Sequence, residues 1–148
     1  DSVSPWMGGR FGKPEQLADF AKKVMAPDLL WCKERKKEYL PVVFPGFSWH
    51  NMFPDKPLNQ IPRLGGQFLW TQFVEAKKAG ATMVYQAMFD EVDEATAIYK
   101  CTNNPPVGES TFLTYEGLPS DHYLWLVGQA AKMIAGKMPL TETMPKRP

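Results

Sequence analysis

The chain has 148 residues, of which 44% are hydrophobic and 22% charged, and its formal net charge is +1. This length and apolar content suit one compact domain, and the balanced charge excludes an extended nucleic-acid-binding surface. No apolar run is long enough to span a membrane and no segment reads as a signal peptide, so we expect neither nucleic acid nor a membrane as partner.

The first predicted unit is a short strand over residues 1–6, followed by a glycine-rich loop and a helix. Pro14 suits the first helical position, and Glu15 favours the positive end of the helix dipole. Apolar residues then recur on one stripe of the helix: Leu17, Phe20, Ala21 and Val24. Pro27 is expected to end or kink this helix, with residues 28–38 forming a second helical piece.

The second predicted unit begins with a strand over residues 40–44, in which Pro41 is tolerable only near the start. The strand ends in a loop rich in groups that can stack or hydrogen-bond, with the sequence Pro45-Gly46-Phe47-Ser48-Trp49-His50-Asn51. After further prolines the pattern predicts a helix over residues 65–79, and Gly80 is its stop signal.

The third strand, within residues 81–96, organises the chain. A mainly apolar run from Ala81 to Phe89 leads directly into four carboxylates, Asp90, Glu91, Asp93 and Glu94. A continuous apolar run is typical of a strand covered on both faces, as in parallel sheets. Ligands bind at the carboxyl ends of such strands, so the acidic residues are candidates for a functional site.

Beyond this point we expect a weak strand at residues 111–115 and a helix that Ser120 can cap and that runs to Gly136. Alternating strands and helices predict right-handed crossovers and a parallel sheet, hence an α/β fold. A complete barrel needs about 200 residues or more. We therefore interpret residues 1–138 as the C-terminal half of a (β/α)8 TIM barrel whose N-terminal half is missing, and residues 139–148 as a loose tail.

Glu91 and Glu94 are the candidate catalytic pair. If the chain enters a helical turn after Phe89, their side chains share one face with Cβ atoms about 5–6 Å apart. Mutual repulsion and unequal burial then separate their pKa values, so that one carboxyl holds a proton while the other is ionised. Cleavage of a glycosidic bond requires this division between an acid and a base.

Aromatic and polar residues at other strand ends are candidate substrate contacts. We expect Trp6, Trp49 and His50 to surround the same mouth as Asp90, because aromatic faces pack against the axial hydrogens of sugars. Two other interpretations stay open. The acidic residues could only hydrogen-bond sugar hydroxyls, as in a non-catalytic carbohydrate-binding module, or they could hold a structural cation.

Three stretches carry a family resemblance: Ser4-Pro5-Trp6 with Gly9-Arg10, then residues 43–51, and then residues 89–96. They resemble the C-terminal half of glycoside hydrolase family 71/99-like proteins, the endo-α-mannosidase-like superfamily, in particular the bacterial branch labelled xylosidase/arabinosidase. The resemblance extends to about Gly136. It implies a (β/α)8 barrel and a secreted or periplasmic glycosidase that acts on an oligosaccharide or polysaccharide without cofactor or metal.

In the endo-α-mannosidases of family 99, a Glu-Trp-His-Glu-Gly-Thr motif carries both catalytic glutamates. By similarity the first falls on Glu91 and the second on Glu94. The resemblance implies that Glu91 acts as base on the sugar's own 2-hydroxyl, giving an anhydro-sugar intermediate, and that Glu94 acts as acid and then as base. Three motif positions differ and put the mannose preference in doubt, because Trp, His and Gly are replaced by Val92, Asp93 and Ala95.

Overall fold

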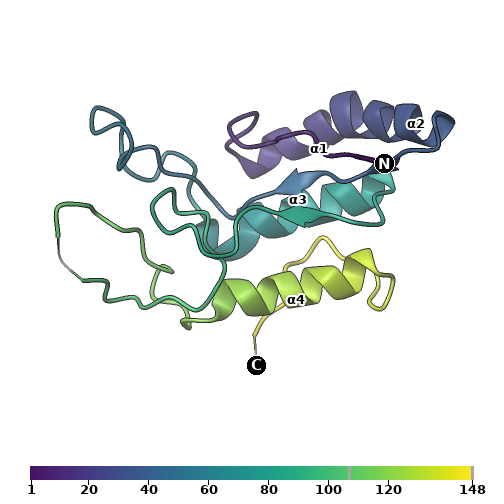
Figure 1. Cartoon of the computed structure of the whole chain (residues 1–148). Coiled ribbons are helices and arrows are strands. Elements are labelled where there is room, and N and C mark those ends of the chain that lie inside the picture. Colours follow the sequence, from purple (N-terminus) through teal and green to yellow (C-terminus); the bar gives the residue numbers. More distant parts are fainter. Residues whose placement is uncertain (107, 148) are drawn as a thin grey trace.

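A computed structural model describes residues 1–106 and 108–147 as a small α/β domain in which short parallel strands pack against helices (Figure 1). Strand β1 (Ser2–Val3) pairs in parallel with β2 (Glu38–Tyr39). Strand β3 (Val42–Val43) pairs in parallel with β4 (Tyr85–Gln86). The predicted parallel pairing is therefore confirmed, although each strand is shorter than the sequence indicates.

Strands β2 and β3 are two parts of one extended segment. The Leu40 N–H donates to the Val3 carbonyl (2.9 Å), which continues the pairing with β1. The Tyr85 N–H donates to the Pro41 carbonyl (2.9 Å), which begins the pairing with β4. Because Pro41 has no N–H, the ladder is interrupted there. The central segment thus lies between the first and the third strand, in the order of the sequence.

The first helical segment runs without a break from η1 (Pro14–Gln16) through α1 (Leu17–Phe20) and η2 (Ala21–Met25) to α2 (Ala26–Glu34). The prediction that Pro27 ends this helix is wrong. Pro27 lies in the first turn of α2, directly after the π-helical turn η2. Such a turn accommodates the proline ring and its missing N–H without ending the helix.

The later helices agree with the predicted ranges. A short 3-10 turn, η3 (Leu64–Gly66), leads into α3 (Gln67–Ala79), which Gly80 ends with a φ of 102°. Helix α4 spans His122–Ile134. The predicted Ser120 cap is wrong, since Asp121 occupies the N-cap position and no side chain caps the helix there. No helix in the described part of the chain has the length and apolar character to cross a membrane.

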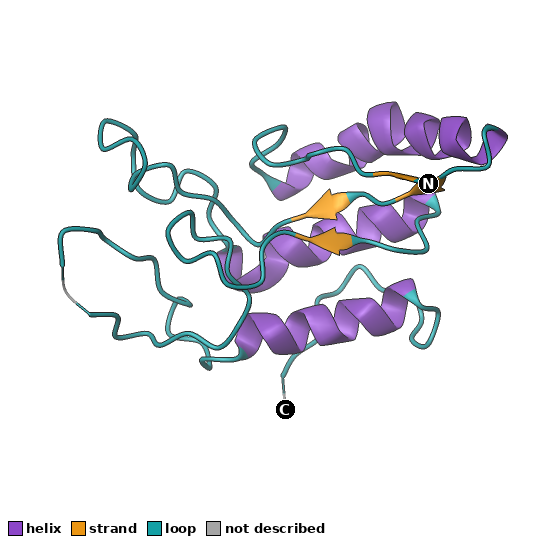
Figure 2. Ribbon diagram, in the orientation of Figure 1, coloured by secondary structure: helices purple, strands orange, loops and turns teal. Residues whose placement is uncertain are grey.

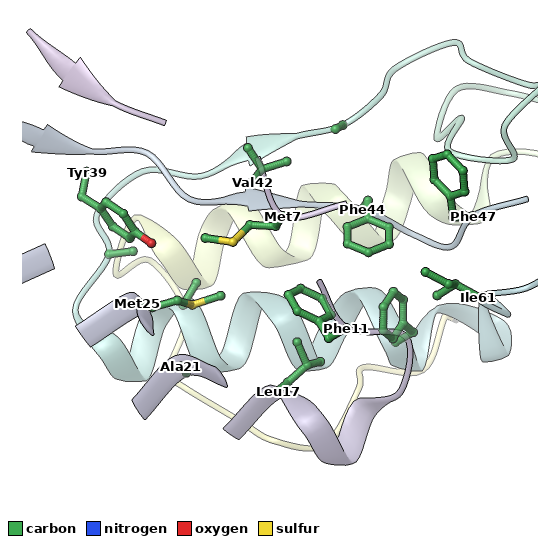
Figure 3. Close-up of a cluster of buried hydrophobic side chains, with 14 of the residues drawn as sticks. Met7, Phe11, Leu17, Ala21, Met25, Tyr39, Val42, Phe44, Phe47 and Ile61 are labelled. Atoms are coloured by element: carbon green, nitrogen blue, oxygen red, sulfur yellow. The ribbon is translucent and has the colours of Figure 1, made fainter. Parts of the chain in front are cut away.

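Two hydrophobic clusters hold these elements together. The first lies between the strands, α3 and the segment 14–34, and Figure 3 shows the rings of Phe11 and Phe44 at its centre. Phe11 stacks on Phe44 with ring centroids 5.5 Å apart, and Phe44 meets Phe68 of α3 edge to face at 5.3 Å. The second cluster joins α3 to α4 through Trp70, Tyr123 and other buried residues.

Two predicted strands need correction. The apolar run after Ala81 forms only the two-residue strand β4, and Tyr85 in it is 41% exposed instead of being covered on both faces. The helices of the described residues therefore leave the Tyr85 side of β4 open. No strand forms at residues 111–115, which the structure describes completely. The apolar character there serves the core, because the buried Tyr115 ring packs against Tyr123.

The segment after α4, predicted to be loose, runs back along α3 and α4. The indole N–H of Trp70 in α3 donates to the Thr141 carbonyl (3.2 Å). Arg147 forms two hydrogen bonds with the Asp121 carboxylate, at 2.6 and 2.9 Å.

The long connections that follow β3 and β4 gather beyond the carboxyl ends of these strands (Figure 2).

Candidate functional site

The four acidic residues lie in a tight turn beyond β4, and we call residues 90–95 the acidic turn. The predicted helical turn is wrong. Residues 92–95 form a single turn closed by the Ala95 N–H on the Val92 carbonyl (3.1 Å), and Ala95 has a φ of 59°. This positive φ stops the chain from continuing as a helix. The turn instead folds back so that the residues after it reach Glu91.

Glu91 is held through both its backbone and its side chain. Its carbonyl accepts hydrogen bonds from the N–H groups of Thr96 (3.1 Å) and Ala97 (2.7 Å). Its Oε1 accepts the N–H of Asp93 (3.1 Å). The side chain therefore caps its own turn, as short polar side chains do in loops, and the half-buried carboxylate is directed across the turn.

Glu94 is half-buried, and its carbonyl accepts the Ser48 N–H (2.8 Å) from the loop after β3. Burial raises the pKa of Glu94, and the charges of Glu91 and Asp93 raise it further. A carboxyl whose neighbours disfavour ionisation can hold a proton for donation, while an ionised partner accepts one. The electrostatics of the acidic turn therefore suit Glu94 as a proton donor.

Asn51 joins the loop after β3 to the acidic turn. Its Nδ2 donates to Asp93 Oδ1 (2.9 Å) and lies 3.2 Å from the Thr111 carbonyl. The sequence places Asn51 in the polar loop but does not indicate this contact, because the two segments lie 42 positions apart. Asp93 is therefore committed to Asn51 and is less free than Glu94 to act on a ligand.

Trp49 lies on the same loop and forms an exposed aromatic surface with Phe53. Trp49 is 39% and Phe53 48% exposed, and their ring centroids lie 5.8 Å apart. The Phe53 N–H donates to the Trp49 carbonyl (2.8 Å). This hydrogen bond closes one helical turn, which brings both rings to the same side. The sequence analysis did not single out Phe53, although its spacing of four from Trp49 is a usable signal.

Three predicted site residues make their recorded contacts away from the carboxyl groups of the catalytic candidates or make none. The imidazole Nδ1 of His50 bonds the Lys56 carbonyl (2.7 Å) within its own loop. Trp6 is 53% exposed and its indole lies over Gly8. Asp90 is exposed. In the part of the chain that the structure describes, none of the three has a hydrogen bond or ring contact with Glu91 or Glu94.

The acidic residues also do not form a metal site. Within residues 1–106 and 108–147, no three side chains of His, Cys, Asp or Glu converge closely enough to hold a metal ion. The structural-cation interpretation of the four carboxylates therefore has no geometric support. Cys32 and Cys101, which lack metal-ligand spacing in the sequence, are free thiols.

Comparison with known proteins identifies a similar fold. No protein-family model matches this chain, and no curated protein sequence matches it significantly. A solved structure of the GH99 endo-alpha-mannosidase from Bacteroides thetaiotaomicron matches with a TM-score of 0.72 and 19% identity, over 92% of this chain and 39% of that chain. A second structure of that enzyme, in complex with BIS-TRIS-Propane, matches with a TM-score of 0.66 and 20% identity, over 93% and 41%.

These identities establish a likeness of fold. The chain spans about 40% of the length of the enzyme that it matches. Its short parallel strands, its helices and its gathered loops are therefore similar in arrangement to part of a GH99 endo-alpha-mannosidase.

Proposed function

We propose that this chain is the C-terminal half of a (β/α)8 barrel in a retaining glycoside hydrolase of the 71/99-like family, with Glu94 as acid and base and Glu91 as its partner. One observation carries the proposal. The half-buried Glu94, whose pKa is raised by burial and by Glu91, follows β4 in a fold similar to a GH99 endo-alpha-mannosidase. Ligand sites of parallel α/β folds lie beyond the carboxyl ends of strands.

In the first step, the Glu91 carboxylate takes the proton of the sugar's 2-hydroxyl. The 2-oxygen forms a bond to C1, the bond from C1 to the leaving oxygen breaks, and the Glu94 carboxyl gives its proton to that oxygen. The raised pKa of Glu94 supports this role, because it favours the protonated form before the step. Glu91 Oε1 accepts the Asp93 N–H, which holds this carboxylate in place within the turn.

In the second step, the Glu94 carboxylate takes a proton from water while the water oxygen bonds to C1. The bond between C1 and the 2-oxygen breaks, and Glu91 returns its proton to that oxygen. Two displacements at C1 give overall retention of configuration. Both carboxyl groups end in their starting protonation states, so the chain needs no cofactor in this scheme.

We propose an oligosaccharide or polysaccharide as substrate. Exposed rings beside a carboxylate pair offer faces to sugar rings, and Trp49 and Phe53 supply two of them. Because Val92 and Asp93 replace the Trp and His of the family 99 motif, we do not carry the mannose preference over. The sequence resemblance favours a xylosidase/arabinosidase-like protein that works outside the cytoplasm, secreted or in the periplasm.

We further propose that the chain alone is inactive. Tyr85 on β4 is 41% exposed, and β4 pairs only with β3 in the described residues. A barrel closes all strand edges and covers its inner face. The strands of the other half supply these partners and the remaining walls of the substrate site.

The experiment measures hydrolysis by the longer polypeptide that contains this chain, on a panel of xylan, arabinan and mannan oligosaccharides. Glu94→Gln and Glu91→Gln are each expected to lower kcat about 10²–10⁴-fold, the usual effect of losing a general acid or base. Glu15→Gln, the same chemical change at an exposed residue of η1 outside the acidic turn, is the matched control and keeps activity close to the wild type. Unchanged hydrolysis by Glu94→Gln contradicts the proposal.

A carbohydrate-binding module is the second candidate, favoured by the exposed pair Trp49 and Phe53. The double variant of Glu91 and Glu94 to Gln separates the two functions. A glycosidase keeps sugar affinity and loses hydrolysis. A binding module shows no hydrolysis by the wild type and loses affinity when Trp49→Ala removes the larger ring.

A further inference from the structure

Arg63 is a buried cation without a carboxylate partner, at the point where the loop after β3 meets η3. It is 4% exposed, and among the residues that the structure describes no acidic side chain forms an ion pair with it. Its Nε and Nη1 are buried there without a hydrogen-bond partner. Burying an unpaired charge is costly, so the presence of an arginine at this position needs an explanation.

Two tyrosine rings enclose the guanidinium. The Cζ atom lies 4.4 Å from the centroid of the Tyr123 ring and 4.9 Å from that of Tyr115. Cation–π attraction replaces part of the lost hydration and fixes the plane of the guanidinium. Gly46 leaves room for the side chain, since a Cβ there would lie 2.8 Å from Arg63 Cγ. Arg63 is therefore held in one orientation.

In that orientation Arg63 binds the backbone of the segment that follows the acidic turn. Its Nη2 donates to the Ala97 carbonyl (2.8 Å). The Tyr115 hydroxyl lies 3.2 Å from the same carbonyl and donates to the Tyr99 carbonyl (2.6 Å). The N–H of the same residue, Ala97, donates to the Glu91 carbonyl (2.7 Å). One residue thus connects the buried guanidinium to the backbone of Glu91.

We propose that Arg63 is a positioning residue, which holds the acidic turn through Ala97 and so fixes the Glu91 and Glu94 carboxyls relative to each other. That the contact between Arg63 and Ala97 serves catalysis rests on the proposed function. Hydrogen bonds in a low-dielectric interior reinforce one another, and catalytic groups must be held to within a fraction of an ångström. The loop that ends at Arg63 also fixes Glu94, through the Ser48 N–H.

The test uses the isolated chain, labelled for NMR, and three variants: Arg63→Met, Arg63→Lys and Arg35→Met. Arg35 follows α2, is exposed and lies over the Trp31 ring, so its loss removes the same charge without touching the acidic turn. The first readout is the pKa of Glu94 from its side-chain carboxyl resonance. The second is hydrogen exchange of the Ala97 amide, compared with amides inside α3.

We expect Arg63→Met to lower the pKa of Glu94 toward its ordinary value. A loosened turn admits water to Glu94 and lets Glu91 and Asp93 move away, which removes the causes of the raised pKa. Loss of a positive charge alone would act in the opposite direction and raise that pKa. The Ala97 amide should exchange about tenfold faster while α3 keeps its protection.

Arg63→Lys should give smaller changes in the same direction, because an ammonium can still donate to the Ala97 carbonyl but lacks the fixed plane. Arg35→Met should change neither readout. An unchanged or raised pKa of Glu94 in a folded Arg63→Met chain overturns the inference, as does equal acceleration of exchange at Ala97 and in α3. If Arg63→Met does not fold, an absence of change in Arg63→Lys overturns it.

Neither readout depends on hydrolysis. If the longer polypeptide cleaves no glycoside, the proposed function is wrong, but the conclusion that Arg63 positions the acidic turn still stands. Conversely, if the longer polypeptide is active but substitution of Arg63 does not change the pKa of Glu94, the proposed function stands and this inference is wrong.

Discussion

Gln72 of α3 is fully buried, and its side chain completes the hydrogen bonding at the end of β3. Its Oε1 accepts the Phe44 N–H (3.1 Å), and its Nε2 donates to the Phe44 carbonyl (2.7 Å). Phe44 follows β3 and leads into the loop that carries Trp49. Gln72→Met removes these two hydrogen bonds and a third, from Nε2 to the Phe68 carbonyl (3.1 Å) within α3, and keeps the side-chain volume close to its original value. We predict a large loss of stability.

The magnitude follows from the groups left unpaired. Phe44 is 2% exposed, so water does not replace the lost partners. An unpaired buried donor or acceptor costs about 1–3 kcal/mol, and two such groups cost about 2–6 kcal/mol. Removing the buried amide of Gln72 offsets part of this cost, which leaves about 2–4 kcal/mol. The whole free energy of unfolding of a typical domain is about 5–15 kcal/mol, so this loss is a large part of it.

Urea unfolding followed by tryptophan fluorescence measures this loss by linear extrapolation. Gln67→Met is the matched control on the same helix, since the Gln67 side chain is half-buried and its amide donates only to Thr71 within the described residues. We expect the control to lose less than about 1 kcal/mol. A loss below about 1 kcal/mol for Gln72→Met would refute the reasoning that its amide completes the strand.

Two further predictions concern the folded chain. Gly66→Ala should lower the free energy of unfolding by about 2 kcal/mol more than Gly117→Ala. Both glycines have positive φ, of 99° and 77°, but only at Gly66 would a Cβ meet a neighbour, Leu126 Cδ2 at 2.5 Å. Thermal unfolding that shows equal effects would contradict this. Glu94→Gln should raise the melting temperature at neutral pH, because a folded-state pKa above the unfolded value means that ionised Glu94 opposes folding. The gain should shrink as the pH falls through the raised pKa to the unfolded pKa; a gain that does not vary with pH would contradict the assigned cause.

The helices could be predicted from the sequence because their signals are local. The apolar stripe of α3 and the stop at Gly80 lie within one segment, and both agree with the structure. Pro27 misled the prediction, since a π-helical turn just before a proline leaves no mark in the sequence. The parallel order of the strands was also predictable, from the alternation of strands and helices.

Tertiary contacts could not be predicted in the same way. Residues 111–115 have strand-like composition, but Tyr115 is buried against Tyr123 and no strand forms. Tyr85 has the same apolar character as its neighbours, yet it is 41% exposed, because none of the helices that the structure describes covers it. Strand propensity describes a half-buried surface and does not say whether a neighbouring strand exists.

The acidic turn also has features that the sequence predicts and contacts that it does not predict. Its position after a strand and its carboxylates were evident from the sequence. The contacts that hold it come from distant segments, through Ser48, Asn51 and Arg63. A buried arginine between two tyrosine rings has no signature in a single sequence, because Tyr115 and Tyr123 lie more than fifty positions away from it.

The dependence of hydrolysis on the leaving group tests the central claim most directly. In the longer polypeptide, kcat/KM would be measured for aryl glycosides whose leaving phenols span a range of pKa values, with the wild type and Glu94→Gln. If Glu94 donates the proton, the variant loses activity steeply on poor leaving groups and retains it on good ones, which need no proton. Parallel dependence in the two proteins would contradict the assignment of Glu94 as the acid.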